Sequence, residues 1–214
     1  MAKKKQTLKE IAYDHIKRKI INCEYAPNAF INEEMIAKEL SVSRTPIREA
    51  LMKLEQEQLI SIMPKKGVVV CPLTPDLITS IFETRLLLEP YIIENYGMYI
   101  DKDKLKEFKA LYEGEYRKTN VEFKIDDDFH SFLYHFSKNP YLIKTLENTT
   151  VQNQRIRVYS GIKVFRVPIT YDEHIQIIKA LLDEDYKLAA NRMKEHILKS
   201  RQNSLEIVFS SKKY

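Results

Sequence analysis

The 214-residue chain contains no tryptophan, only two cysteines and only four glycines. Cys23 and Cys71 are far apart in the sequence and fit no metal-ligand or redox spacing, which favours a reduced, cytoplasmic protein. No apolar run approaches the roughly 20 residues that a membrane-spanning helix needs. The basic residues 1–6 precede no apolar segment, so neither secretion nor a membrane partner is expected. The scarcity of glycine and of strand-like runs indicates a mainly α-helical protein.

Positive charge is distributed unevenly along the chain, whose formal net charge is +5. Pro72 and Pro75 predict a boundary between an N-terminal domain, 1–73, and a C-terminal domain, 74–214. Residues 1–73 carry 13 Lys and Arg against 9 Asp and Glu, whereas residues 74–214 carry 22 against 21. The excess of basic residues therefore lies in the first domain, as binding to a nucleic acid requires.

Residues 41–51, SVSRTPIREAL, are typical of a turn followed by a helix. Thr45 is expected to cap the helix with its hydroxyl. Pro46 suits the first helical position, because its missing N–H would have no intrahelical partner there. One face of this helix is apolar at spacings of four and three residues and should be buried: Ile47, Leu51 and Leu54.

The N-terminal end of that helix is left basic and exposed. Arginines beside free backbone N–H groups suit DNA phosphates and guanine edges. We therefore expect Ser43, Arg44, Thr45 and Arg48 to contact DNA. The preceding segment fits a short helix, 33–40, and the two helices with their connection make a helix-turn-helix.

Two strand-like runs, 59–63 and 68–71, flank a basic tip and predict a β-hairpin. Together with the two helices and a first helix at 7–22, this hairpin completes a winged helix-turn-helix. Lys66 and Gly67 of the wing are expected to contact the DNA backbone or the minor groove.

The run 42–51 and its continuation 54–60 resemble the signature of GntR-family bacterial regulators. Three residues depart from that pattern, since Gln58, Cys23 and Asn28 stand where glycines are common. The resemblance implies a homodimer whose two recognition helices meet a near-palindromic operator of double-stranded DNA.

Beyond Pro75 the pattern is helical almost to the end of the chain. Six helices are predicted, at 76–98, 102–118, 121–137, 140–160, 168–183 and 185–208. An all-helical antiparallel bundle of this size can bury its own core.

Four metal-ligating side chains fall on three of the predicted helices. Asp126 and His130 are four residues apart and share a helix face. His174 and His196 come to nearly the same height when the last two helices run antiparallel. One carboxylate and three imidazoles suit a divalent transition ion, with zinc, nickel, manganese and iron all admissible.

Spacing alone leaves open that the histidines are ordinary core residues, or that Asp127 or Asp128 is the carboxylate ligand. The runs 126–130, 174–180 and 82–89 resemble the FCD subfamily of GntR regulators. That resemblance implies an FCD-like helical domain that dimerises. It also implies that the domain binds a small organic acid with the help of a metal, which all four side chains named above hold.

A carboxylate effector needs a cationic partner as well as the metal. Arg85 and Arg157 are the candidates, with Arg155 beside them, although Arg85 suits an interhelical or dimer salt bridge equally well. We therefore expect a ligand-responsive transcriptional regulator, with repression favoured by the family, and no enzyme. Two alternatives stay open: a metal sensor without an organic effector, and a metal-dependent enzyme with an appended DNA-binding domain.

Overall fold

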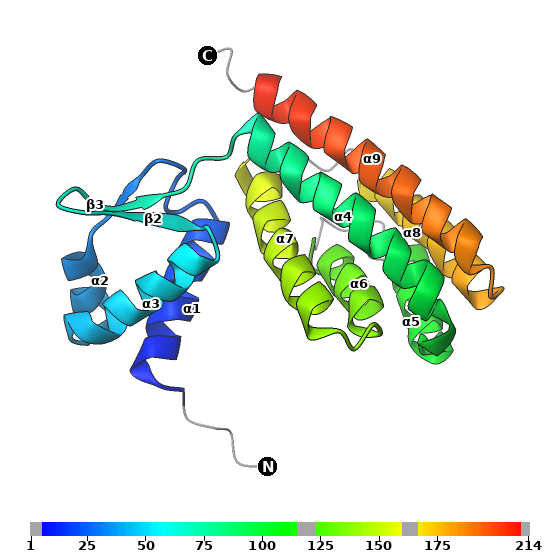
Figure 1. The fold of residues 1–214 in the computed structure, drawn as a ribbon, viewed down its shortest axis with the longest axis horizontal. Helices are drawn as coiled ribbons and strands as arrows, with labels where there is room; N and C mark the ends of the chain where they lie inside the picture. Colours follow the sequence, from blue (N-terminus) through cyan, green and yellow to red (C-terminus); the bar gives the residue numbers. More distant parts are fainter. Residues whose placement is uncertain (1–5, 115–122, 160–166, 211–214) are drawn as a thin grey trace. The chain divides into compact units, whose positions relative to one another are not determined.

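The computed structural model describes residues 6–114, 123–159 and 167–210. The chain divides into two compact units, Met1–Thr74 and Pro75–Tyr214. Helices dominate both units (Figure 1), which confirms the mainly α fold. Among the described residues, no helix is both long and apolar enough to cross a membrane.

The first unit contains three helices and a three-stranded antiparallel sheet with strand order β1-β3-β2. The elements are α1 (Leu8–Ile21), β1 (Phe30–Ile31), α2 (Glu33–Leu40), α3 (Arg44–Gln56), β2 (Ile60–Met63) and β3 (Gly67–Val70). Ile60 pairs with Val70 and Met63 with Gly67 across the predicted hairpin. The two-residue β1 was not predicted, because so short a strand has no periodicity to detect.

The recognition helix α3 begins two residues earlier than the sequence predicts, at Arg44 rather than Pro46. The residue before it is Ser43, whose side chain makes no capping hydrogen bond. The prediction that Thr45 caps the helix is therefore wrong, and Pro46 lies at the third helical position rather than the first. Proline is still tolerated there, because the N–H groups of the first turn lack intrahelical acceptors.

Seven described residues that are not glycine have a positive φ, and four of them lie in the loops that follow α1, α2 and α3. Their φ angles are 55° for Cys23, 68° for Asn28, 53° for Ser41 and 57° for Gln58. Three of them are the positions at which the GntR signature commonly has glycine, and Ser41 ends α2. The chain thus keeps a glycine-like loop geometry without glycine, at a cost of about 1–2 kcal/mol per residue.

The second unit consists of helices throughout its described part. They are α4 (Pro75–Tyr96), the 3₁₀ turn η1 (Gly97–Tyr99), α5 (Lys102–Glu113), α6 (Phe123–His135), α7 (Pro140–Tyr159), α8 (Val167–Leu182) and α9 (Tyr186–Ser210). Helix α4 packs along α9 and against α7 and α6, while α8 packs between α9 and α5 (Figure 1). The predicted helix ends at 118 and 160 and the predicted helix start at 121 lie outside the described residues.

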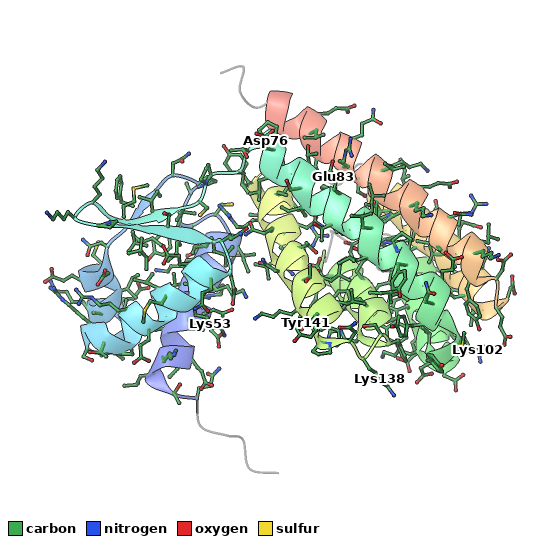
Figure 2. All side chains as sticks on the ribbon, viewed as in Figure 1. Lys53, Asp76, Glu83, Lys102, Lys138 and Tyr141 are labelled. Atoms are coloured by element: carbon green, nitrogen blue, oxygen red, sulfur yellow. The ribbon has the colours of Figure 1, made fainter. Side chains whose placement is uncertain are left out.

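Helix α4 separates a solvent face from a buried face. Asp76 and Glu83, seven residues apart, are exposed on its outer side (Figure 2). The buried stripe is apolar except for two charged members, Arg85 and Glu89, which are 4% and 6% exposed. Burying two charges in an apolar stripe is costly unless they are paired. The residues that pair with Arg85 and Glu89 must therefore lie in the interior of the bundle.

Candidate nucleic-acid interface and metal centre

The first turn of α3 is exposed while the opposite face of the helix is buried. The side chains of Arg44 and Arg48 are 59% and 65% exposed, and Ser43 and Thr45 are exposed as well. The predicted apolar stripe is fully buried: Ile47, Leu51 and Leu54. The end of the helix that sequence analysis assigned to DNA is therefore accessible.

Both arginines meet carboxylates of the first turn of α2. Arg48 Nε donates to Glu33 Oε2 at 3.0 Å, and Arg44 Nη2 lies 3.4 Å from Glu34 Oε2. Sequence reasoning missed these pairs. The sequence did contain a signal for the carboxylates, because Glu33 and Glu34 directly follow the cap Asn32 and acidic residues are favourable at a helix N-terminus. The pairs hold the arginines beside α2 without covering them.

The hairpin tip adds positive charge to the same unit. Lys65, Lys66 and Gly67 are exposed. The N–H of Lys66 donates to the carbonyl of Met63 at 3.0 Å, which closes the turn between β2 and β3. Exposed lysines on a hairpin can neutralise phosphates without reading a sequence.

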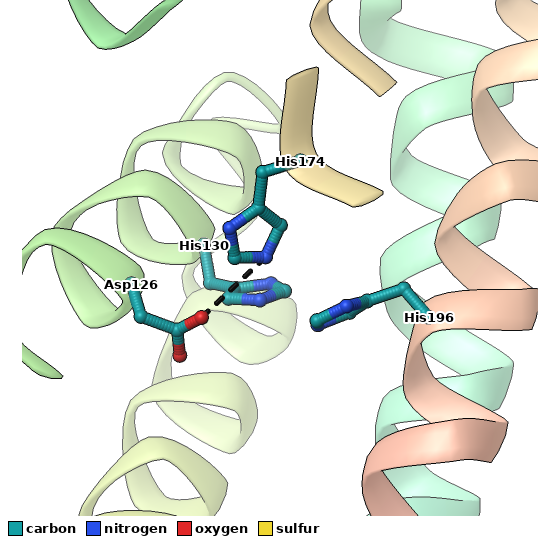
Figure 3. Close-up of side chains that lie close together, drawn as sticks. All are labelled: Asp126, His130, His174 and His196. Carbon is teal, nitrogen blue, oxygen red and sulfur yellow. Dashed lines mark ion pairs between the residues drawn. The ribbon is translucent and has the colours of Figure 1, made fainter. Parts of the chain in front are cut away.

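The four predicted metal ligands converge inside the second unit (Figure 3). One ligand atom from each of Asp126, His130, His174 and His196 lies within 4.8 Å of all the others. The imidazole centroids of His174 and His196 are 4.5 Å apart, and those of His130 and His174 are 5.2 Å apart. Helices α6, α8 and α9 therefore direct three rings and one carboxylate to a single point.

The residues at this point fit a transition metal. Ligand atoms about 2.1 Å from one ion are at most about 4.2 Å apart, so a set that lies within 4.8 Å needs to contract by about 0.6 Å at its widest separation. His174 Nε2 is 3.4 Å from Asp126 Oδ1, a separation that neighbouring ligands of one ion have. His174 is 0% exposed, and neither of its ring nitrogens has a hydrogen-bond partner among the described residues. An unpartnered buried imidazole is costly, and a metal ion would satisfy it.

Each of the other two rings is hydrogen-bonded through Nδ1 to a carboxylate outside the ligand set. His130 Nδ1 donates to Glu89 Oε2 at 2.7 Å, and His196 Nδ1 donates to Glu173 Oε2 at 2.8 Å. Glu89 also accepts from Arg85 Nε at 2.5 Å. The two charges buried in α4 therefore form an ion pair on their own helix, and this pair contacts a ligand histidine. Sequence analysis missed Glu89 and Glu173, although a charged pair within an apolar stripe was a signal for the first.

The second arginine proposed for effector binding lies next to the carboxylate ligand. Arg157 Nη1 donates to Asp126 Oδ2 at 2.5 Å, and its Nη2 donates to Asp127. Asp127 also accepts from Gln154 Nε2 at 2.8 Å, and Asp128 is exposed. Neither of these two acids belongs to the converging set, which contains Asp126. Arg155 is fully buried and donates to Gln152 instead.

Burial and charge together prepare the ligands for a cation. Burial lowers the pKa of His174 well below its usual value, and the neighbouring His196 lowers it further. Burial also lowers the pKa of His196. Burial alone would raise the pKa of Asp126, but Arg157 and the three imidazoles outweigh it, so this pKa is lowered. At neutral pH the site thus offers the neutral imidazoles of His174 and His196 and the ionised carboxylate of Asp126, the forms that bind metal.

Comparison with known families covers both units. Residues 8–70 match the bacterial regulatory proteins of the gntR family, and residues 80–199 match the FCD domain. YdhC, an HTH-type transcriptional regulator of Bacillus subtilis (strain 168), is 29% identical over 196 residues, which cover 87% of this chain and 84% of the relative. The HTH-type transcriptional repressor RspR of Escherichia coli (strain K12) is 24% identical over 197 residues, which cover 90% and 86%.

Solved structures share the fold. A GntR-type regulator from Rhodococcus sp. RHA1 superimposes with a TM-score of 0.78 at 20% identity, covering 92% of this chain and 97% of that one. The Zn²⁺-bound FCD domain of TM0439 superimposes with a TM-score of 0.55 at 21% identity, covering 64% and 98%.

Proposed function

Because the chain belongs to the GntR family of bacterial regulatory proteins and carries an FCD domain, we propose that it is a metal-containing repressor that responds to a small organic acid. That it is a transcriptional regulator and no enzyme follows from the family and from relatives that are themselves transcriptional regulators. What we propose beyond this is that the protein acts as a repressor, that it binds a small organic acid and that it contains a metal.

The N-terminal unit is proposed to bind double-stranded DNA through the exposed end of α3 and the wing. Arg44 and Arg48 supply base-edge and phosphate contacts, while Ser43 and Thr45 contact the backbone. The wing residues Lys66 and Gly67 contact the backbone or the minor groove. Two copies of the chain, joined as a homodimer in the cytoplasm, would present their recognition helices to successive half-sites.

The convergence of Asp126, His130, His174 and His196 is the observation that carries the proposed metal. Four protein ligands on an octahedral zinc, nickel, manganese or iron ion leave room for a bidentate acid, which the ion would attract as a Lewis acid. Arg157 is the better placed of the two predicted effector-binding arginines, because it already binds a ligand carboxylate. Arg85 is held by Glu89 on its own helix, and its Nη2 lies 3.4 Å from both ring nitrogens of His130.

Regulation requires that the acid bind two arrangements of the protein with different affinity. The test is operator affinity, measured by fluorescence anisotropy for the metal-free chain, the zinc-loaded chain, and the zinc-loaded chain with a panel of hydroxy- and keto-acids. We expect one acid to weaken operator binding only when zinc is present. An effect of zinc alone, with no acid effect, would establish the alternative of a metal sensor.

A further inference from the structure

Two buried carboxylates outside the ligand set contact the rings of ligand histidines. We propose that Glu89 and Glu173 are positioning residues, which hold His130 and His196 with Nε2 toward the ion and thereby set the affinity for metal. This inference rests on the proposed metal site and deepens it, because it assigns a role to two residues outside the ligand set, Glu89 on α4 and Glu173 on α8.

The hydrogen bonds determine which ring nitrogen is available. A neutral imidazole has one N–H, and a carboxylate can only accept. With Nδ1 donating to Glu89 at 2.7 Å in His130, and to Glu173 at 2.8 Å in His196, the lone pair of each ring lies on Nε2. A carboxylate in this position also raises the basicity of the ring and fixes its orientation.

Each carboxylate is itself anchored by a cation. Glu89 is bound by Arg85 Nε at 2.5 Å within α4. Glu173 Oε1 is 3.2 Å from Lys199 Nζ of α9. The rings of α6 and α9 are therefore held from neighbouring helices, so that their orientation does not depend on their own helices alone.

His174 lacks this arrangement. No hydrogen bond to either of its ring nitrogens occurs within the described part of the chain, and its Nε2 faces Asp126 at 3.4 Å. Two of the three imidazoles are thus oriented before any ion binds, while the third is held by packing among aromatic rings such as Phe129, at 4.9 Å between centroids. The affinity for metal should depend on the two carboxylates that orient the first two rings.

The test compares Glu173→Gln with Glu195→Gln. Both carboxylates line the same cavity of about 200 Å³ between α8 and α9, but Glu195 pairs with Arg192 rather than with a ligand ring. Zinc affinity is measured by competition with a chromophoric chelator. Glu173→Gln should bind zinc about 10- to 100-fold more weakly, and Glu195→Gln should bind it like the wild type.

A second measurement separates positioning from general loss of structure. Long-range ¹H–¹⁵N spectra of the metal-free wild type should show His196 with its proton on Nδ1. Glu173→Gln should show a mixture of the two tautomers at this ring while His130 keeps its own. The matching test for Glu89 uses the double variant Arg85→Gln/Glu89→Gln, because Glu89→Gln alone leaves a buried guanidinium without its counter-charge. The double variant should change the tautomer of His130.

The outcomes are distinct. Wild-type zinc affinity together with an unchanged His196 tautomer in Glu173→Gln would overturn the inference and leave the proposed metal site standing. A wild-type chain that takes up no zinc would instead remove the proposed metal site, and this inference with it.

Discussion

Arg157 Nη1 donates to Asp126 Oδ2 at 2.5 Å, so the carboxylate ligand of the metal centre also belongs to an ion pair. The guanidinium extends to Asp127 as well, and the side chain of Arg157 is only 9% exposed. This guanidinium is therefore held beside the centre by two acids, at a position from which it can also meet an incoming carboxylate.

Arg157→Gln should affect the binding of the metal and the binding of the acid differently. Removing the guanidinium leaves the four ligands in place and makes their surroundings more negative, so zinc should bind at least as tightly as in the wild type. A charge-assisted hydrogen bond contributes about 1.5–3 kcal/mol, so the acid should bind roughly 10- to 100-fold more weakly. Isothermal titration of zinc and of the acid measures both; an unchanged affinity for the acid would exclude Arg157 from the effector site.

Replacing His174 and His196 together by Ala should abolish stoichiometric metal in the purified protein. The two side chains provide half of the converging ligand set, and the remaining pair on α6 cannot enclose an ion. Elemental analysis of the dialysed protein is the measurement, with His135→Ala, an exposed histidine of α6, as the control. Metal that persists in the double variant would place the ligands elsewhere.

Arg48→Ala should weaken operator binding by about 1–3 kcal/mol, the usual contribution of an arginine that reads a guanine. Its thermal unfolding should match that of the wild type, because the side chain is 65% exposed. Lys53→Ala is the matched control, since it removes the same charge from the last turn of the same helix. Equal losses in both variants would mean that only overall charge matters and that α3 does not read bases.

The metal-free chain should lose stability as the pH falls from 6.5 toward 5. Burial lowers the pKa of His174 and His196 in the folded state, whereas in the unfolded state both titrate near their usual value of about 6.5. Below that pH the unfolded chain binds protons that the folded chain does not. The free energy of unfolding therefore falls by up to about 1.4 kcal/mol per pH unit for each histidine that stays neutral.

Urea unfolding followed by circular dichroism, with a chelator present, measures this effect. The midpoint should be lower at pH 5.5 than at pH 7, and His174→Gln should reduce the difference. A midpoint independent of pH over this range would contradict the burial of neutral imidazoles.

Gln58→Gly should stabilise the N-terminal unit. Gln58 has a φ of 57°, and relief of this left-handed conformation by glycine outweighs the added freedom of the unfolded chain by roughly 0.5–1 kcal/mol. Gln56→Gly is the control, because Gln56 is the last residue of α3, where glycine should destabilise by a similar amount. Calorimetry distinguishes the two; a loss of stability in both variants would show that the strain at position 58 is negligible.

The features that depend on helical periodicity could be predicted from the sequence. The apolar stripe of α3 and the equal heights of His174 and His196 follow from helical spacing, and the structure has both. The start of α3 was misplaced, because the local preferences of Thr45 and Pro46 favour one start and the observed helix begins at Arg44.

Contacts between helices could not be predicted in the same way. The bonds of Glu89 to His130 and of Glu173 to His196 join residues 41 and 23 positions apart, and they depend on the rotation of each helix about its own axis. Spacing within one helix does not determine that rotation. The left-handed conformation of Cys23 and Gln58 was not predicted, although both stand where glycines are common, because side chains of these types rarely adopt it.

The hydrogen bond between Glu89 and His130 restricts how α4 can move. A turn of α4 about its axis, or a slide by one helical pitch, would withdraw the carboxylate from the imidazole at 2.7 Å and leave the buried N–H of His130 without its acceptor. Any such displacement must therefore be accompanied by a rearrangement of α6. The first helix after the domain boundary and the ligands of the metal centre consequently change position together or not at all.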